Sequence, residues 1–386
     1  TALNSGAASG MLRVPPSNVF YTRTAPKVFM SNDCAFNCSY CGCRKRRDDR
    51  ARYTNEPKDF AKMSYDVAAA NGGSVFVTSA VYKTPDNTEE RIIETMRILR
   101  REMNYKGYLH AKIMPGCGPE LIRQAGLYAN RLSVNIEVAR SEGYKAIARD
   151  KNKTNILGPM ARISELIQEY KKGAGGYGRR FATSQTTQLM AGSTGEDDFT
   201  ILNLSQAMYG KYRLSRVYYT AYHNDGRAEG YDGLPDVSTP GWRMTRLYQA
   251  DRLMQLYGFS PRDIAPAEAP NLTSDFDPKA AWALRNLDMF PIEVNIADYD
   301  TLLRIPGIGV TYAKRIIEAR RTCTVTHDVL AKLGVSLKRG RHFLTAGGKY
   351  DGARADDPDV YARLLRSPLG PDAILSGAQR RSSPCE

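Results

Sequence analysis

Short apolar segments alternate with amphipathic helical segments over the first 222 residues, and this alternation constrains the fold more than any other feature of the sequence. The short segments are rich in β-branched and aromatic residues, as in residues 74–79 (SVFVTS). The longer ones repeat apolar residues at helical spacing, as in residues 88–102. We expect strands near 27–30, 74–79, 107–113, 131–138, 184–191 and 215–222, and helices near 57–71, 88–102, 119–128, 141–149, 155–170 and 198–211. Six strand–helix units of this kind predict an α/β fold with a parallel sheet and right-handed crossovers.

A second, smaller module follows in residues 291–321. Asn295 is the expected N-cap of a short helix over 297–304, and a second helix is expected over 311–320. The segment Pro306-Gly-Ile-Gly309 between them is a tight turn. Their apolar positions suit two helices that pack across this turn: Leu302, Leu303, Ile305, Ile308, Ala313, Ile316 and Ile317. Two further helices, near 242–258 and 277–288, are expected before this hairpin.

The chain is strongly basic, with 55 Lys and Arg against 41 Asp and Glu and a net charge of +14. The excess continues in the small module, where residues 291–345 hold nine basic and five acidic side chains. A charge balance of this kind favours a polyanionic partner, and nucleic acid is the first candidate. No run of 18 apolar residues predicts a membrane helix, and residues 1–10 lack the apolar core of a signal peptide.

Four of the seven cysteines fall within ten residues: Cys34, Cys38, Cys41 and Cys43. An odd, clustered set is atypical of a disulfide framework and favours metal ligation in a reducing cytoplasm. A zinc site usually takes two separated ligand pairs, whereas here there is no second pair and the nearest histidine is His110. Three thiolates on one loop can bind three irons of a cubane cluster and leave the fourth iron open. Zinc, a structural cluster and ligation by Cys43 remain alternatives.

The spacing Cys34-x3-Cys38-x2-Cys41, with Tyr40 before the last cysteine, resembles the signature of the radical S-adenosylmethionine (SAM) superfamily. The resemblance implies a [4Fe-4S] cluster on the three cysteines, with SAM bound to the fourth iron and Tyr40 near the adenine. It further implies cleavage of SAM to a 5′-deoxyadenosyl radical, and a reductant such as flavodoxin or ferredoxin. The six strand–helix units match the partial (β/α)6 TIM-like barrel of that superfamily.

By the same resemblance, SAM would be bound by residues at the ends of three strands: Ser79 after the second strand, Ser133, Asn135 and Glu137 on the fourth, and Gln188 and Gly192 on the fifth. Alternation along a strand sets the three residues of the fourth strand on one face. A solvated face is the alternative. The usual Gly-Gly-Glu of the second strand is missing here. His110 and Lys112 alternate on the third strand and share a face.

The hairpin resembles the helix-hairpin-helix module of DNA repair and processing proteins. Its glycines allow a close approach to a phosphate, and amides at the start of the second helix can donate to the phosphate oxygens. The residues expected to contact nucleic acid are Gly307, Ile308, Gly309, Thr311, Lys314 and Arg315. Packing against another protein is the alternative role.

The combination of both modules resembles a family of radical SAM proteins named for DNA modification or repair. The expected organisation is an N-terminal extension (1–24), a radical SAM core (25–222), a loop and helical linker (223–290), the helix-hairpin-helix module (291–345) and a tail (346–386). The resemblance implies a cytoplasmic enzyme that modifies or repairs DNA. RNA, a peptide or a metabolite is an alternative substrate, and a non-catalytic iron–sulfur DNA-binding protein is a further possibility.

Overall fold

The computed structural model describes residues 25–45, 51–174, 180–224, 234–353 and 358–370. These residues form two compact units, which are described separately. The first unit holds the described residues up to 196 together with 207–239, and the second holds 197–206 and those from 240 onward. The expected N-terminal extension (1–24) and parts of the expected linker (223–290) and tail (346–386) lie outside the described residues.

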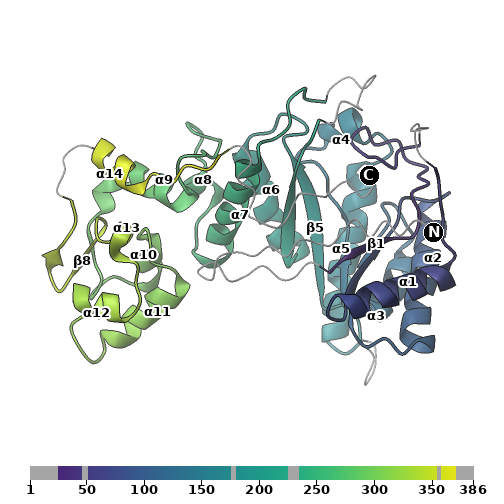
Figure 1. The fold of residues 1–386 in the computed structure, drawn as a ribbon, viewed down its shortest axis with the longest axis horizontal. Helices are drawn as coiled ribbons and strands as arrows, with labels where there is room; N and C mark the ends of the chain where they lie inside the picture. The colour runs from purple at the N-terminus through teal and green to yellow at the C-terminus, as the bar shows by residue number, and fades with distance from the viewer. Residues whose placement is uncertain (1–24, 46–50, 175–179, 225–233, 354–357, 371–386) are drawn as a thin grey trace. The chain divides into compact units, whose positions relative to one another are not determined.

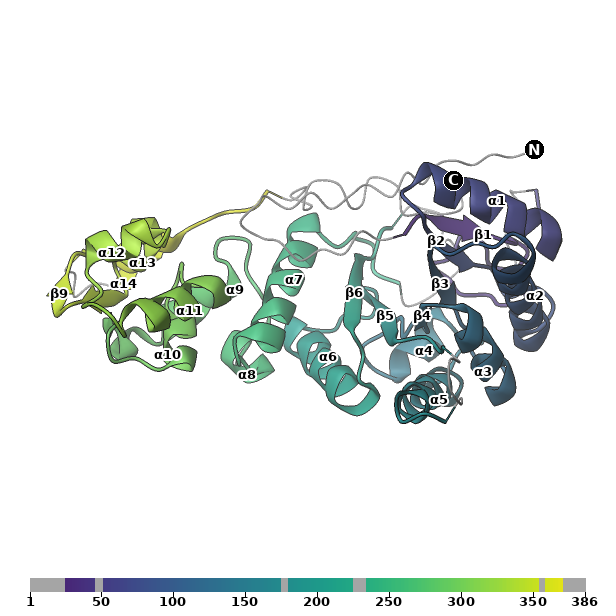
Figure 2. The same cartoon turned by 90° about the horizontal axis from the view of Figure 1, so that it is seen from below.

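The first unit is built on a six-stranded sheet whose order in space follows the order in the chain (Figures 1 and 2). All neighbouring strands are parallel. The strands are β1 (Lys27–Phe29), β2 (Ser74–Thr78), β3 (Tyr108–Lys112), β4 (Arg131–Ser133), β5 (Ser184–Ala191) and β6 (Arg216–Ala221). Sequential parallel strands with helical crossovers make a partial (β/α)6 barrel, so the predicted architecture of this region is confirmed.

Helices connect successive strands. They are α1 (Pro57–Ala70), α2 (Pro85–Arg97) with its π-helical extension η2 (Ile98–Glu102), α3 (Pro119–Tyr128), α4 (Glu142–Ile147), α5 (Lys153–Lys171) and α6 (Asp198–Tyr212). Proline occupies the first position of α1, α2 and α3, where its missing N–H costs no helical hydrogen bond. The side chain of Thr84 caps α2, and Asn152 forms a capping box at α5.

The two faces of the sheet differ in polarity. The helix-covered face holds fully buried apolar side chains: Val75, Val77, Leu109, Ala111 and Leu132. Gln185 lies on this face as well, because its Nε2 donates to the carbonyl oxygens of Met160 in α5 (3.1 Å) and Tyr212 in α6 (2.6 Å). Residues of the opposite parity therefore project from the other face, which we call the inner face. It carries Lys27, Phe76, His110, Lys112, Arg131, Ser133, Ser184, Thr186, Gln188, Arg216 and Tyr218.

Strand β4 is shorter than the sequence predicts, since it ends at Ser133 instead of residue 138. Ser133 pairs with Thr186, whereas the next bridge joins Glu137 to Leu189. Four steps along β4 thus correspond to three along β5, which is the signature of a β-bulge. Glu137 takes a positive φ of 63° at its end. Simple alternation therefore predicts the side of Ser133 but does not extend through the bulge to Glu137.

The side chain of Thr187 satisfies the backbone groups that the bulge leaves without ladder partners. Its Oγ1 accepts the N–H of Ile136 (2.9 Å) and donates to the carbonyl oxygen of Val134 (2.7 Å). Buried main-chain groups need partners of this kind, so Thr187 stabilises the bulge.

The second unit is mainly helical (Figure 1). It contains α7 (Gly241–Leu256), α8 (Pro261–Ile264), α9 (Pro278–Arg285), η3 (Leu287–Met289), α10 (Tyr299–Arg304), α11 (Val310–Ala319), α12 (His327–Lys332), α13 (Leu337–Gly340) and α14 (Pro358–Leu365). Three short strands, β7 (Ile292–Glu293), β8 (Leu344–Ala346) and β9 (Lys349–Tyr350), form a small mixed sheet. In the described part of the chain, no helix has the length and apolar character needed to cross a membrane.

Helices α10 and α11 lie where the sequence predicts the hairpin. Six of its seven expected apolar residues are fully buried: Leu302, Leu303, Ile305, Ile308, Ala313 and Ile316. The expected N-cap is wrong, because Asp298 caps α10 by accepting the N–H of Thr301 (2.7 Å). Asn295 instead bonds to the Glu293 carboxylate and to the carbonyl oxygen of Val325 (3.0 Å).

Candidate active site

The cysteine loop follows β1 and is fixed to the segments that leave two other strands. The N–H of Ala35 donates to the carbonyl oxygen of Val81 (2.7 Å), just after β2. The N–H of Ser39 donates to the carbonyl oxygen of Ile147 (2.9 Å), the last residue of α4. The loop therefore lies at the carboxyl ends of the parallel strands, where active sites of α/β barrels are built.

Arg52 holds the two ends of the cysteine loop together. Its guanidinium donates to the carbonyl oxygens of Asn32 (2.7 Å), Cys43 (3.0 Å) and Arg44 (2.7 Å). Arg44 in turn donates to the carbonyl oxygen of Ser39 (3.1 Å). These contacts are made to main-chain carbonyl groups, so Arg52 and Arg44 brace the backbone of the loop itself.

Cys34, Cys38 and Cys41 are free thiols on this loop. Burial raises the pKa of Cys38 to about 12, although the positive charge of Lys151 opposes the rise. Burial also raises the pKa of Cys34, and the nearby Cys41 adds to it. A metal that binds these sulfurs must therefore displace protons.

The thiols fit an iron–sulfur cluster better than a single ion. The described residues place no three Cys, His, Asp or Glu side chains around a common point, as zinc at about 2.3 Å from each sulfur would require. The thiolates of a cubane cluster bind different irons and lie further apart. Beside the loop, the hydroxyls of Ser79 and Ser133 are buried without a hydrogen-bond partner. Orphaned hydroxyls at strand ends fit a polar ligand there, as expected for SAM.

A buried ion pair lies next to the thiols. Lys151 Nζ lies 2.9 Å from Glu137 Oε1, with side chains only 9% and 4% exposed. The same ammonium group donates to the hydroxyl of Tyr40 (3.3 Å). Three segments that are distant in sequence thus meet at the carboxyl ends of the strands. Since Ser133 and Glu137 are buried, the alternative of a solvated face for the fourth strand is wrong.

The charges around this pair are uneven. Burial opposes ionisation of Glu137, yet Lys151 and Lys112 hold its pKa below the usual value. Burial lowers the pKa of Lys112 despite the attraction of Glu137. Desolvation, with repulsion from Lys112, lowers the pKa of Lys27 to about 8. One carboxylate therefore faces three ammonium groups.

The remaining residues expected to bind SAM lie near the same strand ends. Asn135 hydrogen-bonds to Glu137 and helps to lower its pKa. Gln188 lies on the inner face, and its Nε2 donates to Thr220 Oγ1 (3.2 Å). Gly192 has a φ of +83°, a backbone conformation that glycine adopts more readily than other residues. Its N–H donates to Glu196 Oε1 (2.7 Å), so that amide already has a partner within the turn.

In the second unit, the hairpin turn is partly enclosed by its own surroundings. Gly307 has a φ of +90°, and a Cβ there would lie 3.2 Å from the carbonyl oxygen of Ser336. The side chain of Ile308 is buried, and its N–H donates to the carbonyl oxygen of Ile305. Its carbonyl oxygen accepts Lys279 Nζ (2.5 Å). The amide of Ile308 is therefore not available to a phosphate, contrary to expectation.

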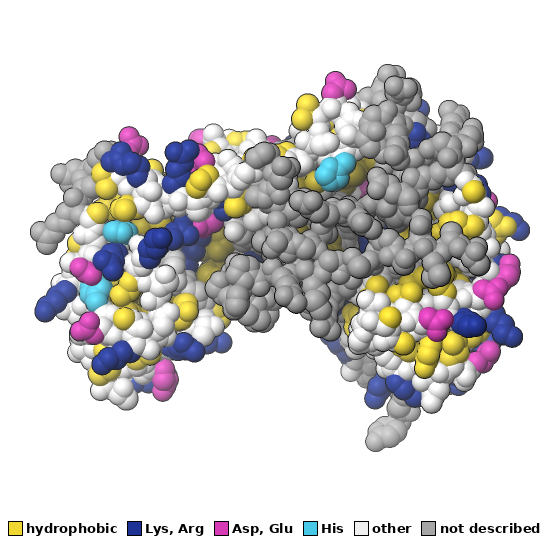
Figure 3. All heavy atoms as spheres, in the orientation of Figure 1, with side chains coloured by type: hydrophobic (Ala, Val, Ile, Leu, Met, Phe, Trp, Pro, Cys, Tyr) yellow, Lys and Arg dark blue, Asp and Glu magenta, His cyan; other side chains and the backbone are white. Residues whose placement is uncertain are grey.

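The exposed start of α11 offers more to an anionic ligand. Thr311, Lys314 and Arg315 are exposed on its surface. Arg315 also donates to the carbonyl oxygen of Leu333 (2.9 Å), which leaves Lys314 as the freer cation of the two. Lys and Arg side chains recur over the face of this unit seen in Figure 3. The described face is compatible with contact to phosphates.

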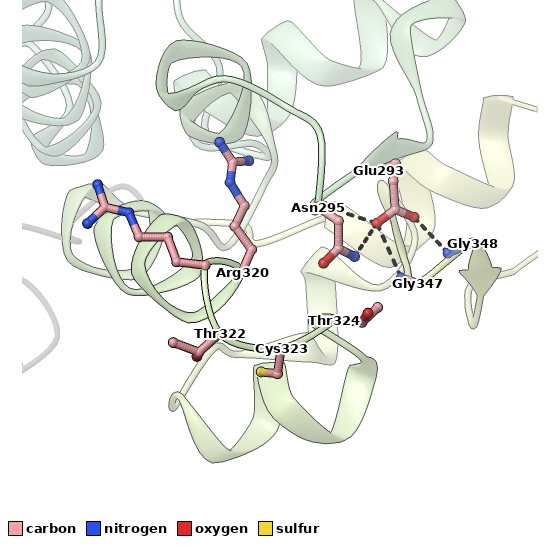
Figure 4. A pocket seen from close by; sticks show the side chains of 9 residues that line it. Glu293, Asn295, Arg320, Thr322, Cys323, Thr324, Gly347 and Gly348 are labelled. Atoms are coloured by element: carbon pink, nitrogen blue, oxygen red, sulfur yellow. Dashed lines mark hydrogen bonds between the residues drawn. The ribbon is translucent and has the colours of Figure 1, made fainter.

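A pocket of about 550 Å³ in the second unit has a different character (Figure 4). Glu293 points into a ring of donors formed by Asn295 and the N–H groups of Gly347 (3.2 Å) and Gly348 (2.9 Å). Burial opposes ionisation of Glu293, but these donors lower its pKa to about 2. The carboxylate is thus a satisfied structural anion.

Sequence patterns did not reveal Lys151, Thr187 or Arg52 as site residues. Lys151 lies in a polar segment between two helices, where no periodicity or motif marks it. Thr187 resembles any buried strand threonine until the bulge is seen. Arg52 belongs to a basic run whose only sequence signal is its charge.

No family model matches the chain, and no curated protein matches it. Among solved structures, the [FeFe]-hydrogenase maturase HydG from Carboxydothermus hydrogenoformans is 14% identical, with a TM-score of 0.44 over 59% of this chain and 50% of its own. Methylornithine synthase (PylB) is 15% identical, with a TM-score of 0.44 over 59% and 61%.

The radical SAM methyltransferase TsrM from Kitasatospora setae is 14% identical, with a TM-score of 0.35 over 50% of this chain and 35% of its own. The chain therefore matches less than two thirds of the length of each of these three proteins.

Proposed function

We propose that this protein is a radical SAM enzyme that acts on nucleic acid, with DNA as the substrate. One observation carries the proposal. Three free thiols with the spacing C-x3-C-x2-C lie on a braced loop at the carboxyl ends of a six-stranded partial barrel, beside buried hydroxyls that have no partner.

The cofactors are a [4Fe-4S] cluster and SAM. Cys34, Cys38 and Cys41 hold the cluster, and Tyr40, Ser79, Ser133, Asn135, Glu137, Gln188 and Gly192 are the candidates to contact SAM. Lys151 orients Glu137 and Tyr40 through the buried contacts described above. Ser79 and Ser133 supply hydroxyls that the protein itself leaves unpaired.

When bound, the cluster and SAM supply an electron transfer that yields methionine and a 5′-deoxyadenosyl radical able to abstract hydrogen. The protein's own contribution is to hold its ligands at the strand ends. A reductant such as flavodoxin or ferredoxin would deliver the electron.

Charge and the α10–α11 hairpin support the choice of nucleic acid. The chain carries a net charge of +14, and Thr311 and Lys314 are exposed at the start of α11. Contacts of this kind bind phosphates without reading sequence, so recognition by the hairpin is expected to be independent of base identity. A target base in a duplex would have to leave the stack to reach the barrel.

Anaerobic reconstitution with iron and sulfide, followed by dithionite and SAM, tests the proposal. We expect 5′-deoxyadenosine to form, to rise when single-stranded or duplex DNA is added, and to be abolished by Cys38→Ala. Cys323→Ala is the matched control, because Cys323 is also a free cysteine but is exposed in the second unit.

The outcomes separate the alternatives. Deoxyadenosine that is indifferent to DNA would contradict the DNA substrate and favour RNA, a peptide or a metabolite. Its absence from a fully reconstituted protein would contradict the radical SAM assignment and favour a non-catalytic iron–sulfur protein.

A further inference from the structure

The distribution of charge over the six strands of the first unit is one-sided. Together they contain no Asp or Glu, but they contain four Lys or Arg residues: Lys27, Lys112, Arg131 and Arg216. All four project from the inner face, since each is in register with the others through β1 to β6. Glu137, the carboxylate that attracts Lys27 and Lys112, is already paired with Lys151. The inner face therefore carries positive charge that the strands themselves do not neutralise.

One row across this face is built like a binding site. Lys112 in β3 is in register with Ser133 in β4, and Ser133 is in register with Thr186 in β5. Both hydroxyls are nine-tenths or more buried and have no hydrogen-bond partner. The Lys112 ammonium makes no hydrogen bond or ion pair with any residue that the structure describes. Arg216 continues the row in β6.

A cation flanked by unpaired hydroxyl donors is the arrangement that binds an oxyanion. Leaving these groups without partners is costly, and a ligand that satisfied them would recover that free energy. Desolvation lowers the pKa values of Lys112 and Lys27; repulsion from Lys151 adds to the effect at Lys112, and repulsion from Lys112 adds to it at Lys27. An anion nearby would relieve these repulsions.

Aromatic surface lies next to the row on the same face. Phe76 and His110 stack with ring centroids 3.8 Å apart and planes inclined by 5°. Tyr218 projects from β6 beneath the guanidinium of Arg216 (5.6 Å). Flat rings beside cations suit a ligand that combines an aromatic base with a negative group.

We propose that Lys112 and Thr186, on either side of the SAM candidate Ser133, form an oxyanion site on the inner face that binds the phosphate of a nucleotide substrate. This inference rests on the proposed function, because it names the group by which the substrate is held inside the barrel. The carboxylate of SAM carries the same oxyanion chemistry and is the competing occupant.

Binding measurements on the full-length protein test the site without relying on turnover. The probes are a deoxynucleoside 5′-monophosphate, the matching deoxynucleoside, inorganic phosphate and SAM, each titrated calorimetrically into the reconstituted protein. We expect the nucleotide to bind at least about tenfold more tightly than the nucleoside, which corresponds to about 1.4 kcal/mol. Inorganic phosphate is expected to compete with the nucleotide.

Two variants and a control locate the effect. Lys112→Met and Thr186→Val should each remove most of the preference for the nucleotide, whereas Lys106→Met, at an exposed surface lysine, should leave it unchanged. Equal binding of nucleotide and nucleoside, or a preference that survives Lys112→Met, would overturn the site. If these two variants lost SAM binding but kept the preference for the nucleotide, the site would bind SAM and not the phosphate of the substrate.

Deoxyadenosine assays on the same samples keep this inference separate from the proposed function. SAM cleavage without a preference for the nucleotide would contradict the oxyanion site and leave the enzyme assignment intact. A nucleotide preference without SAM cleavage would support the oxyanion site and contradict the enzyme assignment.

Discussion

Lys151 Nζ and Glu137 Oε1 lie 2.9 Å apart at the carboxyl ends of the strands, and both side chains are almost completely buried. The bulge after β4 presents the carboxylate, and a segment between two helices presents the ammonium group. Because Lys151 also contacts Tyr40, the pair connects the cysteine loop to the sheet.

Breaking this pair should destabilise the first unit strongly. Glu137→Gln leaves an ammonium group buried without its counter-ion, and the expected cost is about 3–5 kcal/mol in the free energy of unfolding. The double variant Glu137→Gln with Lys151→Met should recover much of that loss. Urea unfolding followed by circular dichroism measures both. Glu102→Gln, which breaks an exposed ion pair, should leave the midpoint unchanged; a similar small effect at Glu137 would contradict the buried pairing.

Two adjacent threonines should respond very differently to the same substitution. Thr187→Val removes the partner of two buried main-chain groups, which costs about 1–3 kcal/mol for each group left unpaired. Thr186→Val removes a hydroxyl that has no partner and should have little effect on the unfolding midpoint. Equal destabilisation by both variants would show that the bulge does not depend on Thr187.

The buried carboxyl of Glu89 should make stability depend on pH. Burial raises the pKa of Glu89 to about 8, although the N–H of Met114 donates to it (2.9 Å). Between about pH 4.5 and 8 the folded state holds the proton that the unfolded state has lost. Stability contributed by this proton is therefore lost as pH rises through that window. Glu89→Gln should flatten the difference in unfolding midpoint between pH 5 and pH 8, and a difference that persists would contradict the shift.

Salt dependence should identify the cation of α11 that contacts phosphate. Lys314→Gln is expected to weaken DNA binding uniformly across sequences and to reduce the slope of log affinity against log salt by about 1. Lys349→Gln, at another exposed lysine of the same unit, is the control. Fluorescence anisotropy at several salt concentrations gives both slopes, and equal behaviour of the two variants would exclude a specific role for α11.

Local patterns predicted most of the fold because each element carries its own signal. Strand β5 and helix α3 have the bounds that the sequence predicts, since both are flanked by clear helix or turn residues. Strand β4 was predicted too long, because alternation alone does not reveal a bulge. Asn295 was predicted to cap α10 because of its residue type. Asp298 caps the helix instead, because it lies three residues before Thr301 and its carboxylate accepts the N–H of that residue.

The candidate site was predictable only where a motif exists. The three cysteines and Tyr40 follow from their spacing, and Ser133 follows from alternation within a regular strand. Lys151 depends on a contact between residues 14 positions apart around a bulge, which no local pattern encodes. The cationic inner face becomes visible only when strand register brings Lys112 and Thr186 into one row.

The brace formed by Arg52 has a consequence for how freely the sequence of the loop can vary. Each of its three partners is a main-chain oxygen, in Asn32, Cys43 and Arg44. The brace therefore constrains the path of the backbone whatever side chains occupy those three positions. The loop can vary in sequence there and keep its course, provided that the arginine is retained.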